Sequence, residues 1–156
     1  MLNIVLYEPE IPSNTGNIIR LCANTGAKLH LIHPLGFELD DKKLRRAGLD
    51  YHEWVNLHQY ASLEDFIEKA KPNRLFVLTT KGSKNYADVS YQEGDTLMFG
   101  PETRGLPNSF LANYQADLKL YLPMKAESRS LNLSNTVSIV LFEAWKQIGF
   151  TGAHLK

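Results

Sequence analysis

The chain has 156 residues, of which 44% are apolar and 22% charged, and this is the length and composition of one ordinary globular domain. Its 17 basic residues balance 17 acidic ones, which excludes an overall positive field, so any nucleic acid must be bound by a local basic patch. A single cysteine (Cys22), the lack of an apolar stretch of about 18 residues and the lack of a basic segment in residues 1–5 predict a cytoplasmic protein without disulfide, membrane span or signal peptide.

Short apolar runs rich in β-branched and aromatic residues predict the strands. In chain order they are Asn3–Tyr7, Lys28–His33, Trp54–Leu57, Arg74–Thr79, Thr96–Gly100 and Leu118–Leu122. Because these runs are continuous rather than alternating, the strands are expected to be covered on both faces, as in parallel sheets.

Helical patterns lie between several of these strands. The first covers Asn14–Thr25, with Ser13 or Asn14 available as its cap, and the second follows Ser62 with apolar residues at helical spacing. A last helix is expected over Asn135–Ile148. The prediction is a single domain over residues 1–156, a doubly wound, mostly parallel α/β sheet of about six strands.

The last predicted helix is more apolar than one sheet face usually requires. Its apolar residues are Val137, Ile139, Val140, Leu141, Phe142, Ala144, Trp145 and Ile148. A helix buried within the monomer and a helix that also forms a dimer interface both fit this pattern.

Several common chemistries lack their sequence marks. The chain has no G-x-G loop, no P-loop and no G-x-S-x-G turn, and its five histidines show no metal-ligand spacing. Cys22 lies in an apolar helical pattern, which favours a core residue over a nucleophile. No metal site is therefore predicted.

Three polar, loop-forming segments carry the chemically useful side chains. They are residues 8–17, which lead to Arg20, residues 97–107 and residues 122–135. The first two lie at the carboxyl ends of predicted strands, which is the edge where open α/β sheets bind ligands. The alternative to a functional role for Arg20 is that it is an ordinary surface arginine.

The second and third segments contain more polar and glycine residues than their turns need. Gly100 and Gly105 permit close approach to the backbone, and a capped turn does not explain Glu102 and Arg104 between them. The third segment crowds serines and asparagines at the start of the last helix, where one cap would suffice.

In this order and spacing, the three segments resemble the three motifs of the SPOUT superfamily of RNA methyltransferases. The resemblance extends from Asn3–Pro9 to Phe142–Trp145 and is closest to the minimal single-domain members, which methylate the ribose 2′-hydroxyl of the tRNA wobble nucleotide. It implies a C-terminal trefoil knot, a homodimer, and S-adenosylmethionine as cofactor, with S-adenosylhomocysteine as product and no metal. The implied substrate is nucleotide 34, a cytidine or modified uridine, of leucine tRNAs.

The resemblance also assigns site residues. Those implied to bind the cofactor are Leu78, Thr79, Gly100, Glu102, Gly105, Leu122, Met124, Ser130 and Leu131, and the implied catalytic set is Arg20, Asn14, Glu102 and Asn132, together with Ser130. The family's motif-one arginine has been assigned as a base. Since a guanidinium scarcely deprotonates, we expect Arg20 instead to clamp a phosphate and stabilise the developing charge on the 2′-oxygen.

RNA binding must then be local. The candidate cations are Arg20, Lys42, Lys43, Arg45, Arg46, Lys81, Arg104 and Arg129, with a solvated helix face as the alternative for residues 42–46. A dimer would double each patch. Two other functions remain open: a ribose methyltransferase that acts on ribosomal RNA or another tRNA position, and a non-catalytic RNA-binding module that retains an adenosyl ligand.

Overall fold

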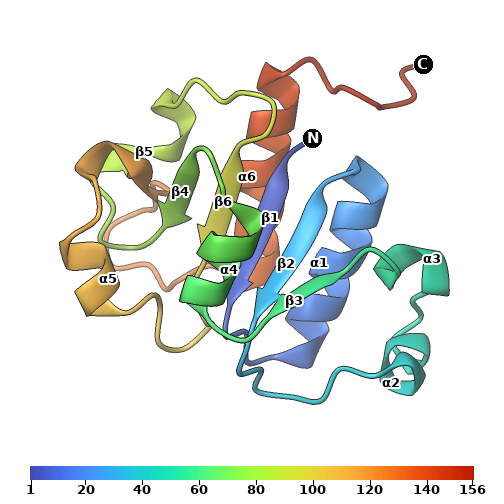
Figure 1. Ribbon diagram of the computed structural model, residues 1–156. Helices are drawn as coiled ribbons and strands as arrows, with labels where there is room; N and C mark the ends of the chain where they lie inside the picture. Colours follow the sequence, from blue (N-terminus) through green and yellow to red (C-terminus); the bar gives the residue numbers. More distant parts are fainter.

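Seven strands form one sheet in which every neighbouring pair is parallel (Figure 1). The computed structural model describes residues 1–156. The strands are β1 (Asn3–Tyr7), β2 (Lys28–Ile32), β3 (His58–Tyr60), β4 (Leu75–Leu78), β5 (Lys84–Asn85), β6 (Thr96–Phe99) and β7 (Lys119–Tyr121), in the spatial order β3-β2-β1-β6-β4-β7-β5. The parallel α/β prediction is confirmed, with one strand more than expected.

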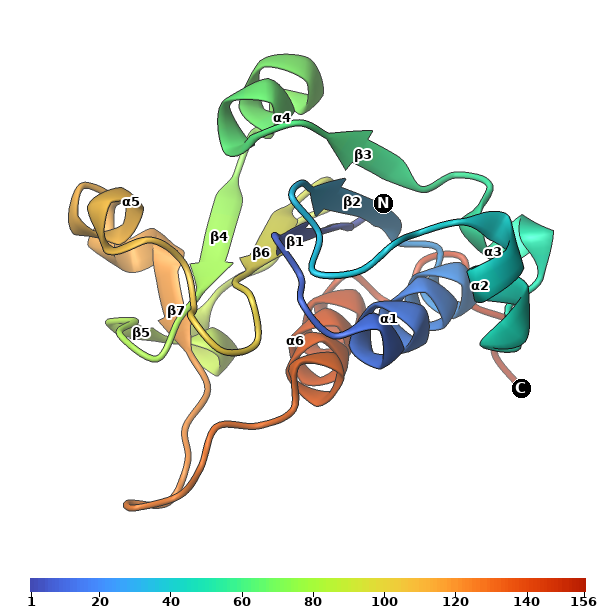
Figure 2. The same ribbon diagram turned by 90° about the horizontal axis from the view of Figure 1, so that it is seen from below.

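Helices cover both faces of this sheet. They are α1 (Pro12–Thr25), α2 (Asp41–Arg46), α3 (Tyr51–Trp54), α4 (Leu63–Ala70), α5 (Asn108–Ala112) and α6 (Leu133–Gln147), with short 3-10 turns at Tyr86–Asp88 and Ala116–Leu118. Figure 2 shows α1 and α6 below the sheet, α4 and α5 above it, and α2 and α3 beside α1. The doubly wound arrangement is therefore confirmed.

Two apolar cores lie on the two faces of the sheet. The larger one has 22 buried residues and joins α1 and α6 to the strands, with Leu6 among its members. The smaller one has eight and joins α4 and α5 to the opposite face, with Val5 among its members. Because successive strand residues point to opposite faces, the continuous apolar run of β1 serves both cores.

The edge of the sheet differs from the prediction. The strand expected at Trp54–Leu57 begins instead at His58, because residues 51–54 form α3 and bury the Trp54 side chain in the larger core. The two-residue strand β5 was not predicted at all. Both errors concern edge strands, whose mostly polar side chains leave no apolar run to detect.

The strand β7 lies between β4 and β5, two strands that follow each other in sequence. The amide of Thr79 donates to the carbonyl of Leu120 at 2.9 Å, and that of Ser83 donates to Lys119 at 3.1 Å. A Cβ atom at Gly82 would lie 2.4 Å from the carbonyl carbon of Leu120, so only glycine permits this passage. A late segment thus passes between two earlier ones, as a knotted chain requires, and the trefoil knot stays a prediction.

The last helix is only partly buried. Val137, Val140 and Leu141 are fully enclosed in the larger core, whereas Ile139 and Phe142 remain 39% and 45% exposed. The wide apolar arc therefore exceeds what this chain covers. No helix has both the length and the apolar character needed to cross a membrane.

Candidate active site

A cavity of about 540 Å³ opens at the carboxyl ends of three adjacent strands. Leu78 ends β4, Phe99 ends β6 and Tyr121 ends β7, and all three residues border it. Ile11 and Asn14, at the start of α1, close one side. This is the edge where parallel α/β sheets place their ligands.

Every residue expected to bind the cofactor lies at this cavity. Its lining includes Leu78, Thr79, Gly100, Glu102, Gly105, Leu122, Met124, Ser130 and Leu131. The three polar segments, which are far apart in the sequence, therefore meet at one place. The wall combines apolar side chains with accessible backbone, which is the usual lining of small-molecule sites.

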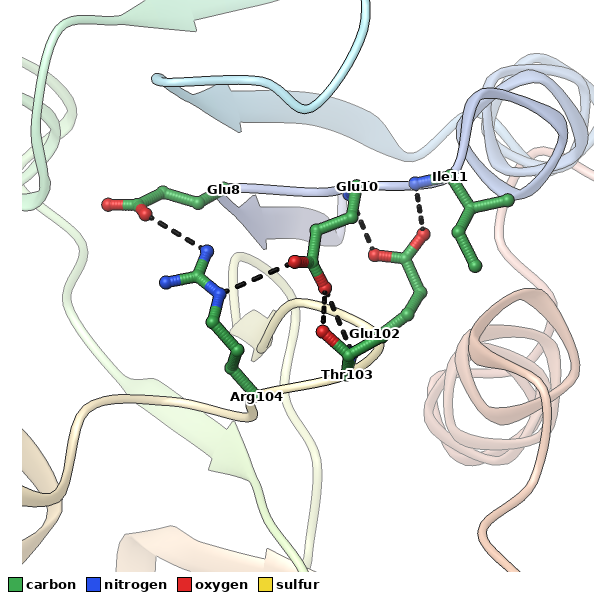
Figure 3. A network of polar contacts seen from close by, with 6 residues as sticks. All are labelled: Glu8, Glu10, Ile11, Glu102, Thr103 and Arg104. Atoms are coloured by element: carbon green, nitrogen blue, oxygen red, sulfur yellow. Dashed lines mark hydrogen bonds and ion pairs between the residues drawn. The ribbon is translucent and has the colours of Figure 1, made fainter.

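Two of the segments are joined by reciprocal carboxylate contacts (Figure 3). The carboxylate of Glu102 accepts the amide of Glu10 at 2.8 Å and the amide of Ile11 at 2.7 Å. In return, the carboxylate of Glu10 accepts the amide and hydroxyl of Thr103, at 2.9 and 2.7 Å. These contacts hold the loop after β1 against the loop after β6.

Arg104 completes this contact from the solvent side. Its Nη2 lies 3.2 Å from Glu8, and its Nε lies 3.4 Å from Glu10 (Figure 3). The hydrogen bonds from Thr103, assisted by Arg104, hold the pKa of Glu10 below its ordinary value. Glu10 is thus a stable anion at neutral pH, and Arg104 is already engaged within the chain.

Asn14, Glu102 and Asn132 form a continuous hydrogen-bonded chain. Asn14 is 4% exposed; its Nδ2 donates to Glu102 at 3.2 Å, and its Oδ1 accepts Nδ2 of Asn132 at 3.0 Å. Asn132 is the N-cap of α6, because its Oδ1 accepts the amide of Ser134 at 2.9 Å. The three residues therefore tie all three polar segments together.

This chain of contacts limits what each side chain can do chemically. Both carboxylate oxygens of Glu102 already accept N–H donors, so the residue serves as an organiser of the two loops.

The expectation that Ser13 or Asn14 caps α1 is wrong. Its N-cap is Ile11, without a side-chain cap, because Pro12 takes the first helical position and Asn14 is used between the segments.

Gly100 is required by the loop that follows it. A Cβ atom there would lie 2.6 Å from the amide nitrogen of Leu106 and 2.7 Å from the carbonyl carbon of Gly105. The loop from residue 101 to 106 therefore folds back directly onto Gly100. Gly105 itself adopts φ +69°, which favours glycine.

Arg20 does not line the cavity, although Asn14 on the same helix does. Its side chain is half-exposed and points toward the segment that carries α2 and α3, where it contacts Glu53 and the carbonyl of Gly48. The structure thus brings Asn14, Glu102, Ser130 and Asn132 to one site and leaves Arg20 apart within a single chain.

The remaining predicted RNA-binding cations are exposed but differ in their partners. Lys43 is paired with Glu38 at 2.9 Å, and Lys81 donates to Asn108 at 2.6 Å. Residues 42, 45 and 46 lie together on α2 and have no ion pair, and Arg129 lies on the exposed loop before α6. The cations with neither an ion pair nor a side-chain hydrogen bond are therefore the patch on α2 and Arg129.

Sequence reasoning did not single out Glu10 or Glu53. Glu10 contacts Thr103 across 93 residues of sequence, and Glu53 contacts Arg20 across 33. No local pattern marks such pairs.

Asp50, His52 and Glu53 form a group of potential metal ligands, but Glu53 is already bound to Arg20 and the group is away from the cavity.

Comparison with known proteins agrees with this geometry. The SpoU rRNA Methylase family profile matches residues 1–142. The tRNA (cytidine(34)-2′-O)-methyltransferase of Escherichia coli K12 is 62% identical over 156 residues, which cover 100% of this chain and 99% of that protein.

Solved structures of RNA methyltransferases are also similar to this chain. One, described as giving insights into the 2-OH methylation of C/U34 on tRNA, is 44% identical with a TM-score of 0.85 and covers 95% of this chain and 96% of its own. An AdoMet-bound rRNA methyltransferase from Sinorhizobium meliloti is 26% identical with a TM-score of 0.79, over 94% of this chain and 56% of its own. The chain therefore belongs to the SpoU rRNA methylase family.

Proposed function

We propose that this protein transfers a methyl group from S-adenosylmethionine to the ribose 2′-hydroxyl of nucleotide 34 in tRNA. One observation carries the reaction: Glu102 and Asn132, from two separate segments, are both hydrogen-bonded to Asn14 of a third segment at a single cavity. The full-length identity of 62% to a tRNA (cytidine(34)-2′-O)-methyltransferase supports the substrate.

The cavity fits the cofactor in size and lining. Its volume of about 540 Å³ falls within the range of roughly 300–1,000 Å³ that small-molecule sites occupy. Leu122, Met124 and Leu131 offer apolar surface for an adenine ring. Gly100 and Gly105, which have no side chain, line the same cavity and offer their backbone for polar contacts. When bound, S-adenosylmethionine supplies an electrophilic sulfonium methyl group.

With such an electrophile, the main work of the protein is positioning. Glu102 holds the two loops, while Asn132 fixes the start of α6 and Ser130 lies at the cavity. Ser130 and the second N–H of Asn132 can hold the ribose hydroxyl in line with the methyl group. Transfer would form the bond between the methyl group and the 2′-oxygen as the sulfonium–methyl bond breaks, which would leave S-adenosylhomocysteine, and the hydroxyl proton would pass to solvent water, so that no side chain has to act as a strong base.

Arg20 acts as a cation in this scheme. Its hydrogen bond and charge interaction with Glu53 raise its pKa above the ordinary value, so the guanidinium remains protonated. A protonated arginine clamps phosphate and stabilises the developing negative charge on the 2′-oxygen. A guanidinium that stays protonated favours the clamp over the base.

The active form is a homodimer in the cytoplasm. Ile139 and Phe142 of α6 are exposed apolar side chains one helical turn apart, and a second copy would cover them. Dimerisation also offers a reason why Arg20 and the cavity are apart within one chain. The free cations of α2, at residues 42, 45 and 46, form a patch for the tRNA backbone that the dimer doubles.

Ribosomal RNA is the second candidate substrate, because the family description and the Sinorhizobium meliloti structure both name it. The test is to incubate the purified protein with labelled S-adenosylmethionine and with total tRNA or ribosomal RNA from a strain that lacks the protein, and then to map the labelled nucleotide. We expect label on the 2′-oxygen of nucleotide 34. Label confined to ribosomal RNA supports the second candidate, and cofactor binding without any transfer supports a non-catalytic module.

A further inference from the structure

The Arg20 guanidinium is held in place by a residue outside its own helix. Its Nε donates to Oε2 of Glu53 at 2.9 Å, and its Nη2 donates to Oε1 at 3.2 Å. Nη2 also donates to the carbonyl oxygen of Gly48. Two parallel bonds to one carboxylate fix the plane of a guanidinium as well as its position.

Glu53 is itself fixed. Its side chain is only 7% exposed, and Oε1 also accepts the amide of Asp50 at 2.8 Å, at the start of α3. By contrast, the Arg20 side chain is 49% exposed, and its Nη1 has no partner in the protein. One edge of the guanidinium is thus anchored to the fold, and the other is open.

We propose that Glu53 is a positioning residue that holds Arg20 with its Nη1 edge available to an RNA phosphate or to the reacting ribose oxygen. This inference rests on the proposed methyl transfer to RNA. Glu53 contacts neither cofactor nor RNA and acts only through Arg20.

Preorganisation is the physical reason for such a residue. A free arginine side chain has several rotatable bonds, and ordering it during the reaction costs entropy. The bonds to Glu53 and Gly48 order it in the folded protein, before RNA binds. A carboxylate without this role would only weaken an arginine that binds phosphate, because its negative charge opposes the phosphate charge.

The same segment carries the free cationic patch. Residues 42, 45 and 46 lie on α2, directly before Gly48 and Glu53 in the chain, and Figure 2 shows α2 and α3 beside α1. The free cations lie on α2 and the groups that hold Arg20 follow within the next seven residues, at Gly48 and at Glu53 of α3. Contact of RNA with α2 and orientation of Arg20 belong to one structural unit.

The experiment compares single-turnover methyl transfer to tRNA by the wild type, Glu53→Ala, Glu53→Gln, Arg20→Ala and the double variant Arg20→Ala/Glu53→Gln. Cofactor affinity by calorimetry and thermal melting are measured alongside. The matched control is Glu68→Gln, which removes one exposed carboxylate on α4 that has no hydrogen bond or ion pair. Displacement of a positioned group by about 1 Å can cost about 10²-fold in rate.

We expect Glu53→Ala to lose about 10²-fold in rate with cofactor affinity unchanged, and Glu53→Gln to lose less because one acceptor remains. In the Arg20→Ala background, Glu53→Gln should cause no further loss. The inference is overturned if Glu53→Ala transfers at the wild-type rate, or if the Gln substitution is equally harmful without Arg20. If Glu53→Ala does not fold, the Gln variants decide. A wild type that methylates no RNA refutes the proposed function and this inference with it, whereas an active wild type with unaffected Glu53 variants refutes the inference alone.

Discussion

The role of Glu102 can be separated from catalysis by a single isosteric change. In Glu102→Gln, one carboxylate oxygen becomes an NH₂ group. Every protein partner of this carboxylate is an N–H donor: the amides of Glu10 and Ile11, and Nδ2 of Asn14. Whichever way the new amide turns, a donor faces a donor.

The structure gives the expected size of the effect. The least costly orientation places the new NH₂ group against the Glu10 amide and preserves the contacts of Oε2 with Ile11 and Asn14. The loss is then one hydrogen bond to a charged acceptor, about 2 kcal/mol. For a domain of this length that corresponds to a fall in melting temperature of roughly 4–8 °C.

Thermal melting without ligand, followed by calorimetric titration with S-adenosylmethionine, measures both consequences. We expect a lower melting temperature and weaker cofactor binding, because the loop from Gly100 to Gly105 lines the cavity. The control is Glu68→Gln, on α4, which covers the other face of the sheet from α1. If Glu102→Gln melts like the wild type and loses only the transfer rate, Glu102 takes part in proton transfer and the organising role is wrong.

Four further outcomes follow from the same contacts. Gly100→Ala should displace the backbone of residues 105 and 106 and weaken cofactor binding by about tenfold or more in calorimetry; unchanged affinity would show that the loop can move freely. Arg20→Ala should lose about 10²–10³ in single-turnover rate while it still binds S-adenosylmethionine, and Arg20→Lys should recover part of the rate; a wild-type rate for Arg20→Ala would make Arg20 a surface residue. Phe142→Glu should yield a folded monomer in sedimentation, since Phe142 is 45% exposed, whereas Val140→Glu should unfold the chain because Val140 is fully buried. If Phe142→Glu still forms a dimer, the interface lies elsewhere. Burial lowers the pKa of His30 to about 4, so as the pH falls the unfolded chain binds a proton at this histidine before the folded chain does. The stability present above pH 6.5 is therefore lost as the pH falls toward 4, by on the order of 3 kcal/mol. Urea unfolding at both ends of this range should show the loss in the wild type and much less of it in a folded His30→Gln variant.

Central strands could be predicted from the sequence because they are buried on both faces. The run Asn3–Tyr7 has the bounds of β1, and Thr96–Gly100 extends only one residue beyond β6. The edge strand β3 is exposed at His58 and Gln59 and carries no such run, so its position was missed. Burial of both faces makes the pattern visible, and exposure removes it.

The location of the site followed from the order of strands and loops. Loops that leave parallel strands at their carboxyl ends must gather at one edge of the sheet, and the resemblance named the side chains in them. All nine residues expected to bind the cofactor lie in the lining of the cavity, and their contact with the cofactor stays a prediction. The exception is Arg20, whose helix begins at the site but whose side chain points toward Glu53.

By itself, the sequence determined the apolar strands, the parallel sheet and the three polar segments at its edge, because these depend on local periodicity and on strand direction. Only the tertiary structure decided which charges meet. Glu10 pairs with Thr103 and Arg104, Glu102 with the start of α1, and Arg20 with Glu53. An ion pair or hydrogen bond needs its two atoms within about 3 Å, and the path of the chain through the sheet, rather than sequence spacing, brings such atoms together.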